Sequence, residues 1–273
     1  MRRRGPWETP TEFMREMTPV ERIRPPSPEE FEERYVRASR PVILRGAIDH
    51  WPALRCWSRE YFKRRFGDRS VPVIRKKGGA MYDADAGLFY ERMRIADYVD
   101  QLSEARPLDL YMVFRVHEVL PEIFDDIARP AYCRDASWYR ARFWFAAPDT
   151  KGPLHRDLPE NLYAQVSGHK QFVMIDRRLT RMVHRHPFYS GVPNYSPVDA
   201  EEPDLLRHPR FGDAPRMLAT LEPGDLFYIP SLWWHQAHSL DLSLSVNLWW
   251  ARGWMVPVVR AAEAFMKVRD LKL

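Results

Sequence analysis

Short apolar runs separated by turn residues fill the second half of the chain, and this alternation restricts it to an all-β core. Strand-length runs bounded by Gly, Pro and Asp are typical of a barrel or sandwich. One of the turns, Ser167-Gly168, separates two such runs in the manner of a hairpin. The predicted strands are residues 143–146, 162–166, 171–175, 217–221, 226–229 and 243–250, and residues 203–216 between them are predicted to be an irregular surface excursion.

Helical patterns dominate the first half of the chain. Ser27 precedes Pro28 and two acidic residues, a pattern that marks a helix start, and this helix is expected to run to residue 38. Further helices are predicted at residues 59–66, 95–102, 121–127 and 256–271, and short strands at 41–44 and 71–75. The chain therefore divides into a flexible basic N-terminal arm at 1–27, a single domain at 28–255 and a C-terminal helix at 256–273.

Composition excludes some classes of protein. Hydrophobic residues make up 45% of the 273 residues, which suffices for a sizeable core. No apolar run is long enough for a membrane helix, and the basic start of the chain is followed by no apolar segment, so we expect neither a membrane anchor nor a secretion signal. The net charge of +5 suits an anionic small molecule or an acidic partner, whereas nucleic acid requires a more concentrated basic face. Cys56 and Cys133 show no metal-ligand spacing, so we expect two reduced thiols in a cytoplasmic protein.

Three residues form a candidate metal site. His155 and Asp157 are two residues apart, so on a strand their side chains point to the same face. His235 follows an aromatic run, residues 228–234, where a buried imidazole needs a partner. Two histidines and one carboxylate form the facial triad of non-haem Fe(II) oxygenases, which leaves coordination positions for a 2-oxo acid and O₂. Taken alone, His235 is better explained as a satisfied buried histidine, and the combination carries the argument.

Two long motifs resemble those of the JmjC or cupin-like hydroxylases. Residues 155–170 (HRDLPENLYAQVSGHK) resemble the first iron motif and residues 224–235 (GDLFYIPSLWWH) resemble the second, while residues 245–250 look like the closing strand. The likeness covers roughly residues 28 to 252 and is greatest for the branch resembling the asparaginyl hydroxylase that inhibits hypoxia-inducible factor. It implies a mainly β fold, a double-stranded β-helix (cupin or jelly-roll) core with N-terminal helices and a C-terminal helix.

The resemblance also implies a co-substrate site. Lys170 lies where this branch places the lysine that binds the distal carboxylate of 2-oxoglutarate, and Tyr111 resembles a tyrosine that bonds to the same group. Asn161 and Asn247 occupy positions that approach the metal-bound end. Relatives often carry Thr or Ser shortly before the first iron histidine, and residues 151–154 here offer no hydroxyl, so Tyr111 or Tyr163 is expected to supply that hydrogen bond. Without the resemblance, Lys170 would be an exposed lysine at a hairpin and Tyr111 a core tyrosine on a strand.

These motifs predict an Fe(II)- and 2-oxoglutarate-dependent dioxygenase that uses O₂ to hydroxylate an unactivated C–H bond. The compact layout favours an amino-acid side chain of a protein or peptide as substrate. The alternatives are a free small molecule or natural product, then a tRNA base, and, in another class, a non-catalytic cupin that binds a ligand. Val258, Ala262, Phe265 and Val268 form an apolar stripe on the C-terminal helix, which is expected either to pack on the barrel or to pair with its copy in a homodimer. The resemblance implies the second alternative, because relatives use C-terminal helices to dimerise.

Overall fold

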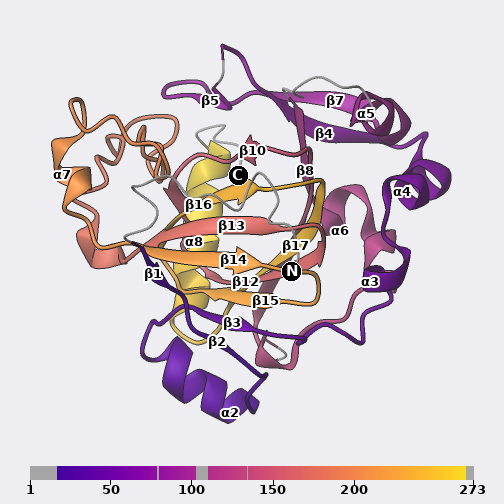
Figure 1. Ribbon diagram of the computed structural model, residues 1–273, viewed down its shortest axis with the longest axis horizontal. Helices are drawn as coiled ribbons and strands as arrows, with labels where there is room; N and C mark the ends of the chain where they lie inside the picture. Colours follow the sequence, from indigo (N-terminus) through magenta and orange to yellow (C-terminus); the bar gives the residue numbers. More distant parts are fainter. Residues whose placement is uncertain (1–16, 79, 103–109, 134, 269–273) are drawn as a thin grey trace, which may run out of the picture.

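Two facing β-sheets form the centre of the molecule. The computed structural model describes residues 17–78, 80–102, 110–133 and 135–268. Within these residues, the larger sheet has the order β2 (Arg22–Ile23), β3 (Val42–Leu44), β15 (Leu226–Ile229), β12 (Glu160–Ser167), β17 (Ser243–Ala251), β9 (Trp138–Ala146), β8 (Leu110–Arg115), β4 (Ser70–Arg75) and β7 (Tyr90–Arg94). The smaller sheet has the order β1 (Thr18–Pro19), β14 (Met217–Leu221), β13 (Lys170–Ile175), β16 (Trp234–Ser239) and β10 (Thr150–Lys151), and β11 (His155–Arg156) also pairs with β16. Figure 1 shows β14, β13 and β16 side by side.

Most successive core strands lie in different sheets, and of the strands from β12 to β17 only β13 and β14 follow each other within one sheet. β12 pairs with β15 and β17 in the larger sheet, whereas β13 pairs with β14 and β16 in the smaller one. This alternation is that of a jelly roll, and the predicted fold class is confirmed.

The predicted hairpin at Ser167-Gly168 is wrong, because the turn carries the chain from one sheet to the other. Gly168 has φ +70°, and a Cβ on it would lie 2.1 Å from the carbonyl oxygen of Leu242. The glycine is required by this close crossing of two chain segments.

Helices from both ends of the chain flank the sheets. Ser27 and Ser58 cap α2 and α4 as predicted, since their hydroxyls accept hydrogen bonds from the backbone N–H groups of Glu30 and Tyr61. Figure 1 places α3, α4 and α6 on one side of the sheets. None of the helices in the described parts of the chain is long and apolar enough to cross a membrane. The helices are α2 (Pro28–Phe31), α3 (Ala53–Cys56), α4 (Arg59–Phe66), α5 (Ile95–Leu102), α6 (Val116–Val119), α7 (Pro209–Gly212) and α8 (Met255–Val268); short turns of other helix types span Glu32–Val36, Pro121–Asp125, Ala131–Cys133 and Arg177–Leu179, and a small ribbon pairs β5 (Tyr82–Asp83) with β6 (Gly87–Leu88).

The main hydrophobic core lies between the larger sheet and these helices. Leu244, Val246 and Leu248 of β17 point into it and pack in one cluster with Trp57 and Phe62. The intervening residues of β17 point the other way, toward the smaller sheet. The interior between the sheets therefore holds polar side chains and a cavity, together with a second apolar cluster that includes Phe172 of β13 and Phe227 of β15.

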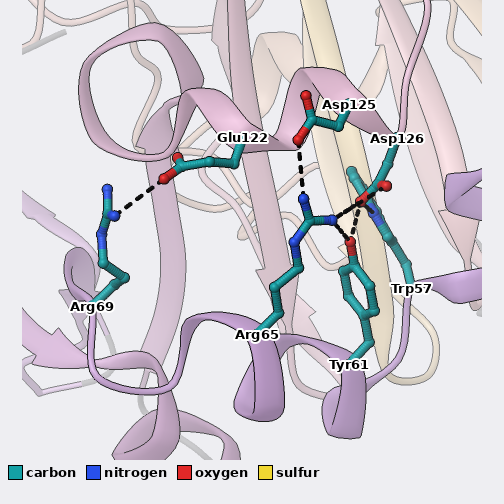
Figure 2. A network of polar contacts seen from close by, with 7 residues as sticks. All are labelled: Trp57, Tyr61, Arg65, Arg69, Glu122, Asp125 and Asp126. Atoms are coloured by element: carbon teal, nitrogen blue, oxygen red, sulfur yellow. Dashed lines mark hydrogen bonds and ion pairs between the residues drawn. The ribbon is translucent and has the colours of Figure 1, made fainter.

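A polar network joins α4 to the 3₁₀ turn Pro121–Asp125 (Figure 2). The carboxylate of Asp126, 7% exposed, accepts hydrogen bonds from the Trp57 indole N–H at 2.9 Å and from the Tyr61 hydroxyl. Arg65 reaches both Asp126 and Asp125, at 3.4 and 3.0 Å. Burial, followed by the bond to Asp126, raises the pKa of Tyr61 to about 12. The network fixes the helical layer against the turn that follows α6.

Two sequence expectations need correction at the ends of the chain. Residues 1–16 of the predicted arm lie outside the described residues, but Thr18–Pro19 and Arg22–Ile23 pair in parallel with β14 and β3, so strand pairing begins before residue 28. Among the described side chains of α8, Val259 is buried at 3% exposure, while Val258 and Phe265 of the predicted stripe are 43% and 53% exposed. The face that packs on Trp138 and Ala251 is therefore the one beside the stripe, so packing of the stripe on the barrel is wrong and its pairing in a dimer stays a prediction.

Candidate active site

Strand pairing brings the three predicted metal ligands together. β11 pairs with β16 so that His155 lies directly opposite His235. One potential ligand atom from each of His155, Asp157 and His235 lies within 4.8 Å of the others, and His235 Nε2 is 3.7 Å from Asp157 Oδ2. Asp157 follows β11 rather than belonging to it, so it is positioned by other contacts: its carbonyl accepts a hydrogen bond from Leu232 N at 2.7 Å, and its carboxylate accepts one from Trp249 Nε1 at 3.0 Å.

Backbone carbonyls fix the tautomers of both histidines. His155 Nδ1 donates to the carbonyl of Pro153 at 2.9 Å, and His235 Nδ1 donates to that of Trp233 at 3.0 Å. Since a carbonyl only accepts, each Nδ1 carries the proton and each Nε2 keeps a lone pair. Burial, followed by the neighbouring His155, lowers the pKa of His235 to about 4, so its ring is neutral near pH 7. Two imidazole nitrogens and one carboxylate oxygen fit the donor set of a divalent iron centre.

Lys170 is a fully buried cation surrounded by hydroxyl groups. It is 0% exposed, and its Nζ donates to Tyr163 at 2.7 Å, Ser245 at 3.2 Å and Tyr111 at 3.5 Å. Burial lowers its pKa to about 7. Among the described residues no carboxylate lies within 4.0 Å of this nitrogen. A charged ammonium so placed is stabilised when an anionic ligand joins it.

The remaining co-substrate candidates line one cavity of about 180 Å³ together with the metal ligands. Asn161 is 2% exposed, and its Oδ1 accepts no hydrogen bond from any described residue. Asn247 accepts a hydrogen bond from Trp144 Nε1 at 2.7 Å. Tyr111 and Tyr163 also line this cavity. The structure therefore brings all eight predicted site residues to one place, with Lys170 just behind Tyr111 and Tyr163.

Several cavity residues were missed by sequence reasoning. The ring of Tyr195 stacks on His155 with a centroid distance of 5.3 Å, but Tyr195 lies in an irregular segment that carries no periodic signal. Arg142 lies one residue before the predicted strand 143–146, whereas β9 begins at Trp138. Strand alternation from Trp144 would have placed Arg142 on the cavity face. His184 and His186 are not part of the metal-ligand group, because His184 contacts His208 and His186 contacts Tyr82.

Comparisons with known proteins agree with this geometry. A family model described as "Cupin-like domain" matches residues 28–253. Lysine-specific demethylase 8 of Xenopus tropicalis is 34% identical over 241 residues, which cover 86% of this chain and 53% of that protein. The bifunctional peptidase and (3S)-lysyl hydroxylase JMJD7 of Homo sapiens is 27% identical, with 83% and 82% covered. The tRNA wybutosine-synthesizing protein 5 of Homo sapiens is 24% identical, with 85% and 78% covered. The chain thus spans about half the length of the demethylase.

Proposed function

The chain belongs to the cupin-like (JmjC) domain family, and from this premise we propose that it is an Fe(II)- and 2-oxoglutarate-dependent oxygenase that hydroxylates an unactivated C–H bond. One observation carries the proposal: the His155, Asp157 and His235 group shares an enclosed interior with the buried cation of Lys170. A metal site alone suits many reactions, whereas a metal site with a buried lysine beside it suits a dianionic 2-oxo acid.

His155, Asp157 and His235 would hold the iron. Bound Fe(II), with O₂ and 2-oxoglutarate, supplies oxidative decarboxylation to succinate and CO₂ and the oxidising power for hydroxylation. The backbone carbonyls behind the two imidazoles hold both Nε2 atoms toward the centre. The Trp249 indole holds the Asp157 carboxylate through its Oδ2 atom.

Lys170 would bind the distal carboxylate of 2-oxoglutarate. Tyr163, Ser245 and Tyr111 already contact its ammonium, and their hydroxyls would donate to the same carboxylate. They would thereby replace the hydroxyl that residues 151–154 lack. The unpaired Oδ1 of Asn161 and the side chain of Asn247 line the cavity nearer the metal ligands. Apolar walls that include Ile74 and Phe172 would exclude water from the reacting atoms.

The proposed substrate is an amino-acid side chain in a protein or peptide. A groove of about 300 Å³ shares the lining residues Asp157, Asn194 and Trp249 with the cavity, and an extended chain could lie in it. Two of the relatives are named as a lysine demethylase and a lysyl hydroxylase, which also act on side chains. A free small molecule remains the second candidate, because the cavity would accept one without using the groove. Both cysteines are free, which suits the reducing cytoplasm proposed as the location.

Anaerobic titration with Fe(II) and 2-oxoglutarate, followed by O₂ and measurement of succinate, tests the proposal. Wild-type protein should bind both and release succinate. His155→Ala should lose iron binding, whereas His184→Ala, whose ring contacts His208 instead of the metal group, should retain it. Lys170→Met should raise the 2-oxoglutarate requirement by roughly ten- to a hundredfold, because it removes a charge-assisted contact worth about 1.5–3 kcal/mol. A non-catalytic cupin would bind a small molecule but form no succinate with or without iron, and equal iron affinity in wild type and His155→Ala would contradict the site.

A further inference from the structure

Arg142 is a buried cation in the candidate active site that the reaction as proposed does not use. It lies on β9 and lines the 180 Å³ cavity with only 8% of its surface exposed. Its guanidinium stacks over the ring of Trp249 at 4.7 Å and also approaches Trp144 at 5.8 Å. The two tryptophans hold the planar group in a fixed position within the cavity.

Among the described residues, Arg142 has no carboxylate within 4.0 Å and no hydrogen-bond acceptor. Its guanidinium contacts the rings of Trp249 and Trp144 by stacking. Arg216 is equally buried, yet it donates to the carbonyl of Phe211 at 3.3 Å. A buried guanidinium without acceptors loses hydration that no protein group replaces. The N–H donors of Arg142 are therefore available to an acceptor that enters the cavity as a ligand.

Strand register separates Arg142 from the site assigned to 2-oxoglutarate. Arg142 pairs with Asn247 of β17, while Lys170 contacts Ser245, the next inward-facing residue along that strand. Trp249, on which Arg142 stacks, lies on the other side of Asn247 and donates to Asp157. Lys170 thus meets this row at Ser245, whereas Arg142 meets it at Asn247 and Trp249, nearer the metal ligand Asp157.

We propose that the substrate group presented to the metal carries a carboxylate, as an Asp or Glu side chain does, and that Arg142 binds it. This inference rests on the oxygenase function proposed above and names the class of its substrate. A guanidinium binds a carboxylate through two parallel hydrogen bonds, which also orients the carbons next to it. The apolar wall formed by Ile74, Leu88 and Val113 suits the methylene groups of such a side chain.

Charge in the adjoining groove favours a polypeptide source of this carboxylate over a free acid. Arg156 and Arg185 line the groove, and repulsion from Arg185 contributes, after burial, to a lowered pKa of Arg156. Their recorded hydrogen bonds go to the Thr180 hydroxyl and the Pro193 carbonyl, so neither is neutralised by a described carboxylate. An acidic segment lying in the groove would relieve this repulsion.

Isosteric pairs of capped tripeptides test the proposal. The central residue is Asp or Asn in one pair and Glu or Gln in the other, and N-acetylaspartate represents a free acid. Binding is measured by calorimetry to protein loaded with Fe(II) and 2-oxoglutarate without O₂. Each acidic peptide should bind at least about tenfold more tightly than its amide, the ratio expected for a charge-assisted bond. Tighter binding of N-acetylaspartate than of the Asp peptide would indicate that Arg142 binds the carboxylate of a free acid and not that of a polypeptide.

Variants of Arg142 test whether this residue causes the preference for the acidic peptides. Arg142→Gln should bind the acid and amide members of each pair equally, and Arg142→Lys should recover part of the preference, since it restores charge without the planar fork. Arg92→Gln, a change of the same charge on the edge strand β7, should behave as wild type. Equal binding of acid and amide by wild type, no binding of any acidic probe, or a preference that survives Arg142→Gln would overturn the proposal. Succinate release by wild type without peptide is measured separately, so failure of the oxygenase function is distinguished from failure of carboxylate recognition.

Discussion

At the scale of single residues, the site is defined by two buried cations with different surroundings. Lys170 is enclosed by hydroxyls that donate as well as accept, so they accommodate either its charged or its neutral form. Arg142 is stacked against two tryptophan rings and has no carboxylate partner among the described residues. The lysine can thus respond to pH and to 2-oxoglutarate, whereas the arginine is held in place by stacking on the two tryptophans.

The burial of Lys170 predicts a pH-dependent stability. Its pKa is about 7 in the folded protein and near 10.5 when unperturbed, so between these values the unfolded chain binds more protons. The free energy of unfolding should therefore rise with pH across this window. Below about pH 7 the buried Lys170 is charged, and its full destabilising effect is present. Urea unfolding of the metal-free protein, compared with Lys170→Met at each pH, measures this contribution. Parallel curves for the two proteins would contradict it.

At the scale of elements, sequence patterns located helices and strands better than they identified strand partners. The helices at 59–66 and 95–102 agree with the structure, because the Ser58 cap of the first and the apolar spacing of both are local signals. The Ser167-Gly168 turn was assigned to a hairpin because a turn signal does not tell whether the next strand stays in the same sheet. The register of α8 was off by one position because Val258 and Val259 are both apolar, and only packing on Trp138 decides between them.

The candidate site was predictable where long motifs carry it. The metal ligands and Lys170 lie in such motifs, and Asn247 lies in the residues that resemble the closing strand. Asp157 lies beside the two histidines for a reason other than strand alternation, since it follows β11 and is positioned by Leu232 and Trp249. Tyr195 reaches His155 from an irregular segment, and only tertiary structure reveals such a contact.

The network around Asp126 predicts how strongly the helical layer depends on one carboxylate. Asp126→Ala would leave the buried Trp57 indole N–H without its acceptor, at a cost of about 1–3 kcal/mol in the free energy of unfolding. Asp125→Ala is the matched control, because its side chain is 66% exposed and its ion pair with Arg65 should contribute less than about 1 kcal/mol. Chemical denaturation of both variants decides the matter, and equal losses would show that burial of Asp126 is not the cause.

At the scale of the whole molecule, α8 belongs to two surfaces. Val259 packs on the barrel, and Phe265 and Ala262 line the groove that adjoins the cavity. Val258, 43% exposed, faces away from that packing, as does Trp254, 77% exposed, just before the helix. If two chains pair through the outward face of α8, each groove is still lined by the α8 of its own chain.

We predict a homodimer held through this outward face of α8. Light scattering at micromolar concentration should give about twice the chain mass of 32.4 kDa. Val258→Asp should shift the mass toward one chain, because a carboxylate in an apolar contact loses hydration. A wild-type mass of 32.4 kDa would contradict the prediction.

The pairing of β11 with β16 also has a consequence for biosynthesis. His155 leaves the ribosome long before its partner His235, and the strands that must form between them include β13, β14 and β15. Loops of this length close late, after local helices and turns have formed. A nascent chain that lacks β16 holds only part of the ligand set, so iron capture would coincide with completion of the barrel. The metal would then stabilise only finished molecules, since it favours the state that binds it.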